Sequence, residues 1–184
     1  SQMLKIKNID NIIVLTSLEE SDDQIEKFCI KNKINYIRGP LEDVYSRFCL
    51  ALETFPCDGF VRICADSPFA NECLINYAID VFNQNDCIYV TNTIDRNFPK
   101  GLSIQISNSN EFLSQRYVNS QKFSSEHICN GFESEIYKSN RINIFSNQLF
   151  DKESYAIDDK DDLNLLHIKT SFNIDPKSFY YKRI

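Results

Sequence analysis

Two aspartates each follow a short apolar segment, and both could take part in metal chemistry. Asp66 comes after residues 59–63, Gly-Phe-Val-Arg-Ile, and Asp158 follows residues 155–157, Tyr-Ala-Ile. Ligands of open α/β sheets lie beyond the carboxyl ends of the strands, so carboxylates at two such ends are well placed to hold Mg²⁺ beside a phosphate. Asp66 and Asp158 are therefore candidate Mg²⁺ ligands.

Helix capping is the alternative explanation for both acidic sites. Asp66 or Ser67 could accept hydrogen bonds from the first amides of a following helix. The acidic run from residue 158 to residue 162 is also typical of a helix N-terminus, where the helix dipole favours negative charge. Capping explains each site alone better than a metal does, and the presence of two such sites shifts the balance towards the metal.

Three arginines in the first half of the chain supply the opposite charge. Arg38, Arg47 and Arg62 lie at or near the ends of expected strands and helices, where a guanidinium can bind phosphate or carboxylate through two hydrogen bonds. Arg47 follows Asp43 by four residues, so a local helical ion pair explains it equally well. Arg62 interrupts an apolar strand and needs a partner there.

Two further positions are candidates for contact with a substrate. Lys100 stands between a proline and a glycine in the turn Asn-Phe-Pro-Lys-Gly-Leu, residues 97–102. Glu126 and His127 begin an expected helix, and the chain has only two histidines. An exposed turn lysine and a structural histidine are the ordinary explanations of these positions.

Apolar runs alternate with amphipathic segments through the first half of the chain. This order predicts βαβ units and a mainly parallel sheet, with an antiparallel appendage in the second half. The expected helix at 22–30 places Ile25, Phe28 and Cys29 on one helical face. Strands are expected at 11–16, 35–38, 59–65, 87–91, 103–107, 142–145 and 155–157, and helices at 22–30, 42–55, 71–82, 110–118, 125–137 and 159–168.

Length and composition restrict the class of protein. A chain of 184 residues with 42% apolar side chains can bury one core, and a net charge of −6 argues against a nucleic-acid surface. No apolar run is long enough to span a bilayer, and no secretory signal opens the chain. Seven scattered cysteines without a CxxC pair predict reduced thiols and a cytoplasmic location.

Taken in order, these segments resemble one protein family. They are Arg38-Gly39, residues 43–48, residues 61–68, Phe98-Pro99-Lys100-Gly101, Glu126-His127, and Ile157-Asp158 followed by residues 161–163. Their order and spacing over residues 11–168 resemble the cytidylyltransferases of spore coat polysaccharide biosynthesis, which are related to acylneuraminate and deoxy-octulosonate cytidylyltransferases.

The resemblance implies a fold, a reaction and a set of roles. The fold would be a nucleotide-diphospho-sugar transferase-like three-layer sandwich, and the reaction would transfer CMP from CTP to a sugar with Mg²⁺ as cofactor. A homodimer is compatible with it, whereas nucleic acid and membranes are not expected as partners. By motif position, the metal ligands would be Asp66 and Asp158, the catalytic residues Arg62 and Lys100, and the substrate-binding residues Arg38, Arg47, Glu126 and His127.

The chain also departs from the family pattern. It begins after the family's first strand and triphosphate-binding loop, so we expect one domain over residues 1–184 that lacks both. Ser125 and Ser154 replace common arginines, and Ser103 and Gln105 replace acidic residues. These departures favour a second hypothesis, a non-catalytic binding or assembly module. A glycosyltransferase ranks third, because Asp66-Ser67-Pro68 is not the acidic pair that such enzymes carry.

Overall fold

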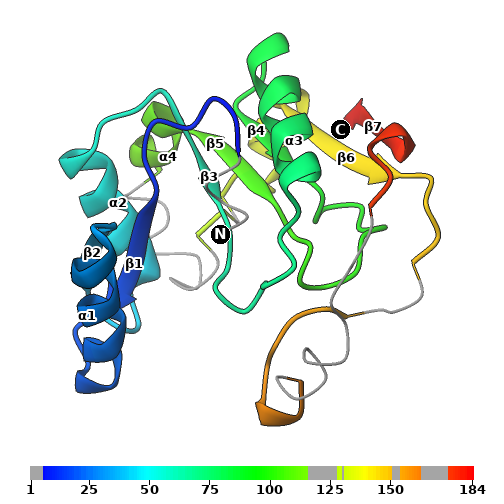
Figure 1. The fold of residues 1–184 in the computed structure, drawn as a ribbon. Coiled ribbons are helices and arrows are strands. Elements are labelled where there is room, and N and C mark those ends of the chain that lie inside the picture. Colours follow the sequence, from blue (N-terminus) through cyan, green and yellow to red (C-terminus); the bar gives the residue numbers. More distant parts are fainter. Residues whose placement is uncertain (1–5, 116–127, 130, 151–153, 163–173) are drawn as a thin grey trace. The chain divides into compact units, whose positions relative to one another are not determined.

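The computed structural model describes residues 6–115, 128–129, 131–150, 154–162 and 174–184 (Figure 1). The chain divides into two compact units. Unit 1 comprises residues 1–8, 60–107 and 135–184, and unit 2 comprises residues 9–59 and 108–134. The expectation of a single domain over the whole chain stays a prediction.

Unit 2 is built on a pair of parallel strands. Strand β1 pairs with β2 from Ile13 opposite Asn35 to Ser17 opposite Gly39, and helices α1 and α2 both contact the two strands. The strands and helices expected in this part of the sequence are thus confirmed. The elements of unit 2 are β1 (Ile13–Ser17), η2 (Glu20–Asp22), α1 (Asp23–Asn32), β2 (Asn35–Gly39), α2 (Val44–Thr54) and α4 (Ser109–Ser114).

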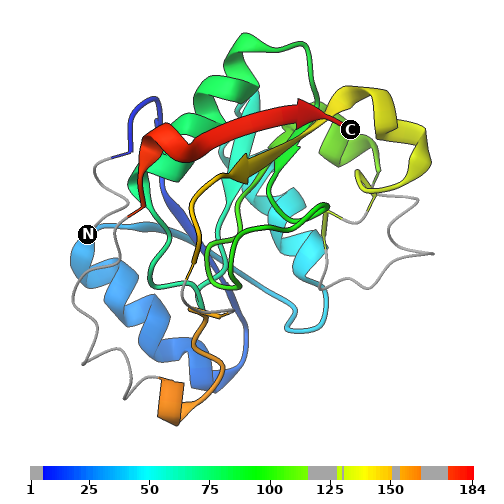
Figure 2. The same cartoon turned by 90° about the vertical axis from the view of Figure 1, so that its right-hand side faces the viewer.

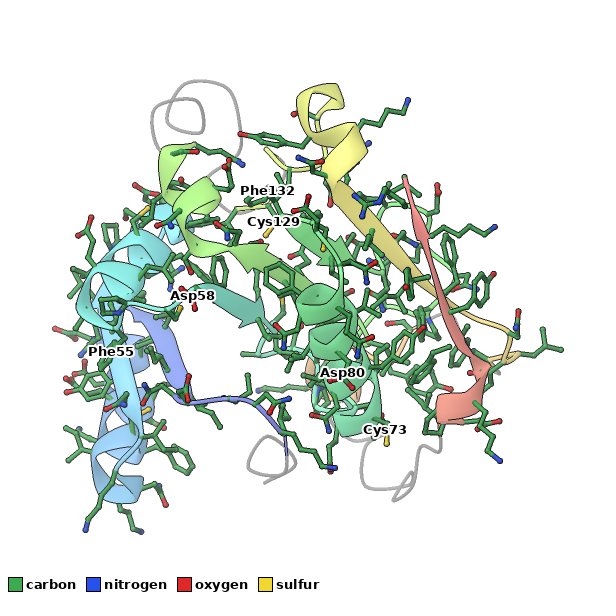
Figure 3. All side chains as sticks on the ribbon, turned by 90° about the horizontal axis from the view of Figure 1, so that it is seen from above. Phe55, Asp58, Cys73, Asp80, Cys129 and Phe132 are labelled. Carbon is green, nitrogen blue, oxygen red and sulfur yellow. The ribbon has the colours of Figure 1, made fainter. Side chains whose placement is uncertain are left out.

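Aromatic packing joins the two sequence segments of unit 2. The ring centroids of Tyr45 and Phe112 lie 4.6 Å apart, and the Tyr45 hydroxyl donates a hydrogen bond to the Phe112 carbonyl oxygen. Phe112 in turn stacks on Phe132, whose amide donates to the carbonyl of Cys129 over 3.0 Å (Figure 3). The core of unit 2 therefore depends on residues more than sixty positions apart in sequence.

The apolar face of α1 in unit 2 is only partly buried. Cys29 of α1 is buried, but Ile25 and Phe28 are 40% and 60% exposed. Among the described residues the main contacts of α1 are with β1, β2 and η2. A two-stranded sheet covers a narrow stripe of a helix, so part of the predicted apolar face stays in solvent.

The helix expected at residues 125–137 is wrong where the structure describes it. Residues 128–129 and 131–134 form turns, and the 3₁₀ helix η3 (Glu135–Asn140) follows. The Ser134 amide and hydroxyl both bond to the carbonyl of Gly131. Gly131 favours such a turn over a continuous helix because glycine lowers helix propensity by about 1 kcal/mol.

Unit 1 contains a five-stranded mixed sheet in the order β3-β5-β4-β6-β7. Strand β4 runs parallel to β6 and antiparallel to β5, while β6 and β7 are antiparallel. The α/β class and the antiparallel strand at residues 103–107 are confirmed. The elements of unit 1 are β3 (Gly59–Arg62), α3 (Glu72–Gln84), β4 (Tyr89–Thr91), β5 (Gln105–Asn108), η3, β6 (Arg141–Ser146), η4 (Pro176–Ser178) and β7 (Phe179–Arg183).

Helix α3 covers part of this sheet with the amphipathic pattern that its sequence predicts. It contacts β4 and β7, and it buries Leu74, Ala78 and Val81. Cys73 and Asp80, on its other side, are exposed (Figure 3). The helix expected at 71–82 is therefore confirmed in place and in orientation.

Strand β7 has no counterpart among the expected elements. It lies along β6 (Figure 2), with Tyr180 opposite Phe145 and their ring centroids 5.2 Å apart. Aromatic cross-strand pairs stabilise antiparallel sheets. The aromatic run Phe179-Tyr180-Tyr181 was the available signal for this strand.

A cluster of charged side chains closes the loop between β1 and α1 in unit 2. The Asp22 carboxylate accepts hydrogen bonds from the Ser17 amide at 2.8 Å and the Thr16 hydroxyl at 2.7 Å, and hydrogen bonds from these two residues lower the pKa of Asp22 well below its ordinary value. Hydrogen bonds from Tyr36 and then Arg38 lower the pKa of Glu26 in the same way. Both carboxylates are thus held in the charged form.

This cluster predicts a loss of stability in acid. A carboxylate whose pKa is lowered in the folded state stabilises the fold above its unfolded pKa of about 4, and that contribution disappears as the pH falls towards the folded value. We expect Asp22→Asn to lower stability at pH 7 by about 1 kcal/mol or less, because solvent screens the site. The variant should also flatten the fall in Tm below about pH 4, which thermal unfolding between pH 2 and pH 7 measures.

Asp10→Asn is the matched control, because Asp10 is exposed and lies outside the cluster. Parallel Tm curves for Asp22→Asn and the unmodified protein would show that the cluster does not stabilise the fold.

Candidate active site

Backbone hydrogen bonds bring three distant segments of unit 1 together. The Ile157 amide donates to the carbonyl oxygen of Asp66 over 2.8 Å. The Tyr155 amide donates to the carbonyl oxygen of Lys100, also over 2.8 Å, and Lys100 and Ser154 form an isolated parallel bridge. The loops that carry Asp66, Lys100 and Asp158 are therefore neighbours.

The strand expected at residues 155–157 is not formed, which corrects the sequence prediction. The amides of Tyr155 and Ile157 bond to carbonyls of loop residues instead of a strand of the sheet. Tyr155 is 6% exposed, and its ring packs edge-on against Phe69 with centroids 6.0 Å apart. The segment thus places Asp158 beside the loop after β3.

Gly101 allows the loop that carries Lys100 to lie close to the backbone of residues 155–156. Its φ is +82°, a conformation that favours glycine, and a Cβ at this position would collide with the backbone of Tyr155 and Ala156. Glycine is therefore required here both for the turn and for the contact between the two loops.

Asparagine side chains hold the loop between β4 and β5 in place. Asn92 is fully buried; its Nδ2 donates to the Leu102 carbonyl and its Oδ1 accepts from the Ile104 amide, both over 2.9 Å. Asn97 bonds in the same two-sided way to the backbone of Ser146. These side chains substitute for strand pairing, and they fix the loop while leaving Lys100 exposed.

The capping explanation of Asp66 is wrong. Helix α3 begins at Glu72, and its N-cap is Asn71, whose side chain accepts from the amides of Cys73 and Leu74. The Asp66 carboxylate is exposed and accepts a hydrogen bond from the Ser67 hydroxyl over 2.8 Å. Asp66 thus has no helix to cap.

The acidic run at 158–162 separates into two roles. Asp159 accepts hydrogen bonds from the amides of Asp161 and Asp162, and the Asp162 carboxylate accepts from the amides of Asp158 and Asp159. This reciprocal pattern is a capping box. It accounts for two of the four aspartates as caps and leaves the exposed carboxylate of Asp158 outside the cap.

Asp66 and Asp158 would suit a metal site in which the substrate and water supply the other ligands. In the part of the chain that the structure describes, no three His, Cys, Asp or Glu side chains gather as metal ligands. Asp66 and Asp158 would supply two oxygen ligands, a number that suits Mg²⁺ when water and phosphate oxygens complete its octahedral shell. Their role as metal ligands stays a prediction.

Arg62 lies at the end of β3 and is half-buried. Its Nη1 donates to Oε1 of Gln105 over 2.6 Å, and Nε2 of Gln105 donates to the hydroxyl of Tyr89 over 2.8 Å. Gln105 and Tyr89 were not among the predicted site residues. The polar positions of the alternating strand 103–107 were the available signal for Gln105. The two predicted catalytic residues, Arg62 and Lys100, therefore both lie in unit 1.

The other two arginines lie in unit 2. Arg38 pairs with Asp23 and Glu26 at 2.8 and 2.7 Å, and it also donates to two backbone carbonyls. The stem of Arg47 packs on Gly39, where a Cβ would come within 2.5 Å of the Arg47 Cγ. Asp43, the alternative partner of Arg47, instead caps α2: its carboxylate accepts a hydrogen bond from the Ser46 amide. Substrate binding by Arg38 and Arg47 stays a prediction.

Two predicted substrate-binding residues, Glu126 and His127, lie outside the described residues. All seven cysteines are described, and none forms a disulfide. None of the described helices has the length and apolar content that a membrane crossing requires.

The sequence model of one enzyme family matches residues 1–179, which is nearly the whole chain, and its description is cytidylyltransferase. The chain belongs to this family. The resemblance identified from the motifs is confirmed.

Two curated relatives are similar to part of the chain. A protein of uncharacterised function from Methanocaldococcus jannaschii is 30% identical over 69% of the chain and 51% of its own length. The spore coat polysaccharide biosynthesis protein SpsF of Bacillus subtilis is 32% identical over 56% of the chain and 42% of its own length. The chain therefore spans about half the length of these relatives.

Solved structures confirm the cytidylyltransferase fold. A cytidylyltransferase from Leptospira borgpetersenii superposes with a TM-score of 0.78 at 24% identity, covering 96% of this chain and 75% of that one. The 4-diphosphocytidyl-2C-methyl-D-erythritol synthase of Anaerococcus prevotii gives a TM-score of 0.60 at 15% identity, covering 91% and 81%. At such identities the likeness establishes the α/β fold with its mixed sheet.

Replacement of Gly101 should disrupt the contact between the two loops. We expect Gly101→Ala to lower the free energy of unfolding by about 2 kcal/mol or more, since the added methyl group meets both an unfavourable φ and a backbone collision. Lys100→Ala is the control, because it keeps the backbone hydrogen bond and should cost less than about 0.5 kcal/mol. Urea unfolding measures both; equal losses would mean that the approach at Gly101 is unimportant.

The assignment of caps predicts a contrast between two neighbouring positions. Asn71→Ala should cost about 1 kcal/mol in urea unfolding because it removes the N-cap of α3. Asp66→Ala should change stability by less than about 0.5 kcal/mol, as is usual for an exposed side chain. A cost for Asp66→Ala as large as that for Asn71→Ala would restore the capping explanation.

Proposed function

We propose that this protein transfers CMP from CTP to a sugar, for use in the synthesis of a cell-surface polysaccharide. The observation that carries the proposal is the backbone hydrogen bond from Ile157 to Asp66, which makes neighbours of the two loops that carry the exposed residues Asp66 and Asp158. Membership of the cytidylyltransferase family and the name of the Bacillus subtilis relative support this choice of nucleotide and pathway.

The proposed reaction is a phosphoryl transfer. A sugar hydroxyl oxygen forms a bond to the α-phosphorus of CTP, the bond from that phosphorus to the bridging oxygen breaks, and pyrophosphate leaves with the electron pair. The hydroxyl proton passes to solvent. When bound, Mg²⁺ neutralises the charge that develops on the phosphate oxygens.

The residues of the chain bind and orient the reactants in this proposal. Asp66 and Asp158 hold the metal, while Lys100 and Arg62 contribute positive charge to the anionic substrate groups. The rigid loop around Lys100 presents its ammonium group from a backbone that two asparagines fix. Free cysteines are typical of proteins in a reducing compartment, so the proposal places the enzyme in the cytoplasm.

Pyrophosphate release tests the proposal. The purified protein is incubated with CTP, Mg²⁺ and a panel of neutral and acidic sugars, and we expect release that stops when EDTA removes the metal. Asp66→Asn and Asp158→Asn should each lower kcat/KM by about 10²-fold or more, since each removes a carboxylate that holds the metal in this proposal. Asp161→Asn is the control, because the cap uses the Asp161 amide and not its side chain.

The alternative of a non-catalytic binding module predicts a different result. CTP or a sugar would then bind with no pyrophosphate released under any condition, and the two aspartate variants would keep their fold. Such a result would overturn the enzymatic proposal.

A further inference from the structure

Two arginines of unit 1 are held by neutral side chains. Arg62 donates from Nη1 to Oε1 of Gln105 over 2.6 Å. Arg96, in the loop after β4, donates from Nη1 and Nη2 to the hydroxyl oxygen of Ser103 over 3.1 and 3.2 Å. Among the described residues neither arginine forms an ion pair. No carboxylate in the described ranges balances the charge of either guanidinium.

The two neutral partners share one face of the same extended segment. Leu102, Ile104 and Ile106 alternate with them and are 1%, 1% and 2% exposed. The amide and carbonyl of Ile104 are bonded to the side chains of Asn92 and Thr91. Side chains two positions apart on an extended chain point the same way and are separated by about 7 Å, so Ser103 and Gln105 lie side by side opposite the apolar residues.

A hydrogen bond to Tyr89 fixes the orientation of the Gln105 side chain. Its residue is 9% exposed, and its Nε2 donates to the hydroxyl of Tyr89, which is itself fully buried. The amide therefore directs its oxygen at Arg62 and its nitrogen at Tyr89. A half-buried guanidinium with a neutral partner is held in position while its charge stays available for another anion.

Arg38 shows the contrasting case in unit 2. Two carboxylates and two backbone carbonyls accept hydrogen bonds from its guanidinium, and they balance its charge within the fold. Arg62 and Arg96 have no such balance within the described part of the chain. Arg62 is half-buried, so its charge is costly to leave unpaired, whereas Arg96 is exposed. The missing negative charge is therefore expected on a ligand.

We propose that Arg62 and Arg96 form an anion-binding pair whose selectivity is set by Ser103 and Gln105, and that it takes a phosphate or carboxylate group of a bound substrate. The neutral pair at 103 and 105 keeps both guanidinium charges uncompensated, so an anionic group binds and a neutral one does not. The proposal rests on the proposed function only for the identity of the substrate that carries the anion.

Binding of inorganic phosphate tests this site without turnover. Titration calorimetry at constant ionic strength, with the whole chain and without CTP or Mg²⁺, measures the phosphate affinity of the unmodified protein and of Gln105→Glu, Ser103→Asp and Gln105→Met. We expect the two acidic variants to weaken binding by about tenfold or more, because each places a carboxylate against an arginine. Gln105→Met, which adds no charge, should weaken it less.

Controls separate the site from general electrostatics and from misfolding. Lys177→Gln removes an exposed cation elsewhere in unit 1 and should leave phosphate affinity unchanged. Gln105→Glu should unfold at the same temperature as the unmodified protein or higher, since it gains an ion pair. A parallel titration with acetate tells whether the pair prefers phosphate or accepts carboxylate equally.

Three results would overturn the proposal. They are no phosphate binding to the unmodified protein, full binding by Gln105→Glu, or an equal loss in Lys177→Gln. Because no CTP is present, phosphate binding and CMP transfer can fail separately. Phosphate binding without pyrophosphate release would refute the proposed enzyme and leave the anion site in place.

Discussion

The candidate site depends on two backbone hydrogen bonds between loops. The bond from Ile157 to Asp66 and the bond from Tyr155 to Lys100 are each 2.8 Å long, and neither belongs to a regular strand ladder. Buried backbone groups must be paired, so the segment 154–158 can lie where it does only because the other two loops supply its acceptors. Gly101 makes the approach sterically possible, and the side chains of Asn92 and Asn97 prevent the loop from moving away.

Capping decides which acidic residues are free for chemistry. Asparagine at position 71 and the reciprocal pair Asp159 and Asp162 satisfy the first amides of two helices. With those amides satisfied, Asp66 and Asp158 are not needed as caps, and the Asp66 carboxylate accepts a hydrogen bond from the adjacent Ser67 hydroxyl. From the sequence, helix capping and metal binding both explained these acidic residues. A cap is defined by where the helix begins, and helix boundaries are the least certain part of a pattern.

Local periodicity predicted most of the elements and failed where contacts are long-range. The strands at 13–17, 35–39, 89–91 and 141–146 follow from apolar runs, and α2 and α3 follow from helical spacing. Periodicity placed Ile25, Phe28 and Cys29 on one face of α1, but not the partial exposure of that face, which depends on the width of the sheet beneath it. Residues 155–157 have a strand-like sequence, yet they pair with loops, and no periodic signal distinguishes the two outcomes. The pairing of Arg62 with Gln105 joins positions 43 residues apart and was equally invisible.

Two arginines with similar sequence contexts have opposite electrostatic environments. Arg38 and Arg62 both lie at or next to the end of a short apolar strand, and the sequence predicts substrate contact for each. In the fold, Arg38 meets Asp23 and Glu26 from the adjoining helix, whereas Arg62 meets an amide from a strand far along the chain. A guanidinium balanced within the fold stabilises a loop, while an unbalanced and half-buried one retains an electrostatic preference for an anion. The availability of an arginine for a ligand is therefore set by the charge of its neighbour in space. In this chain, that neighbour is the neutral residue at position 105.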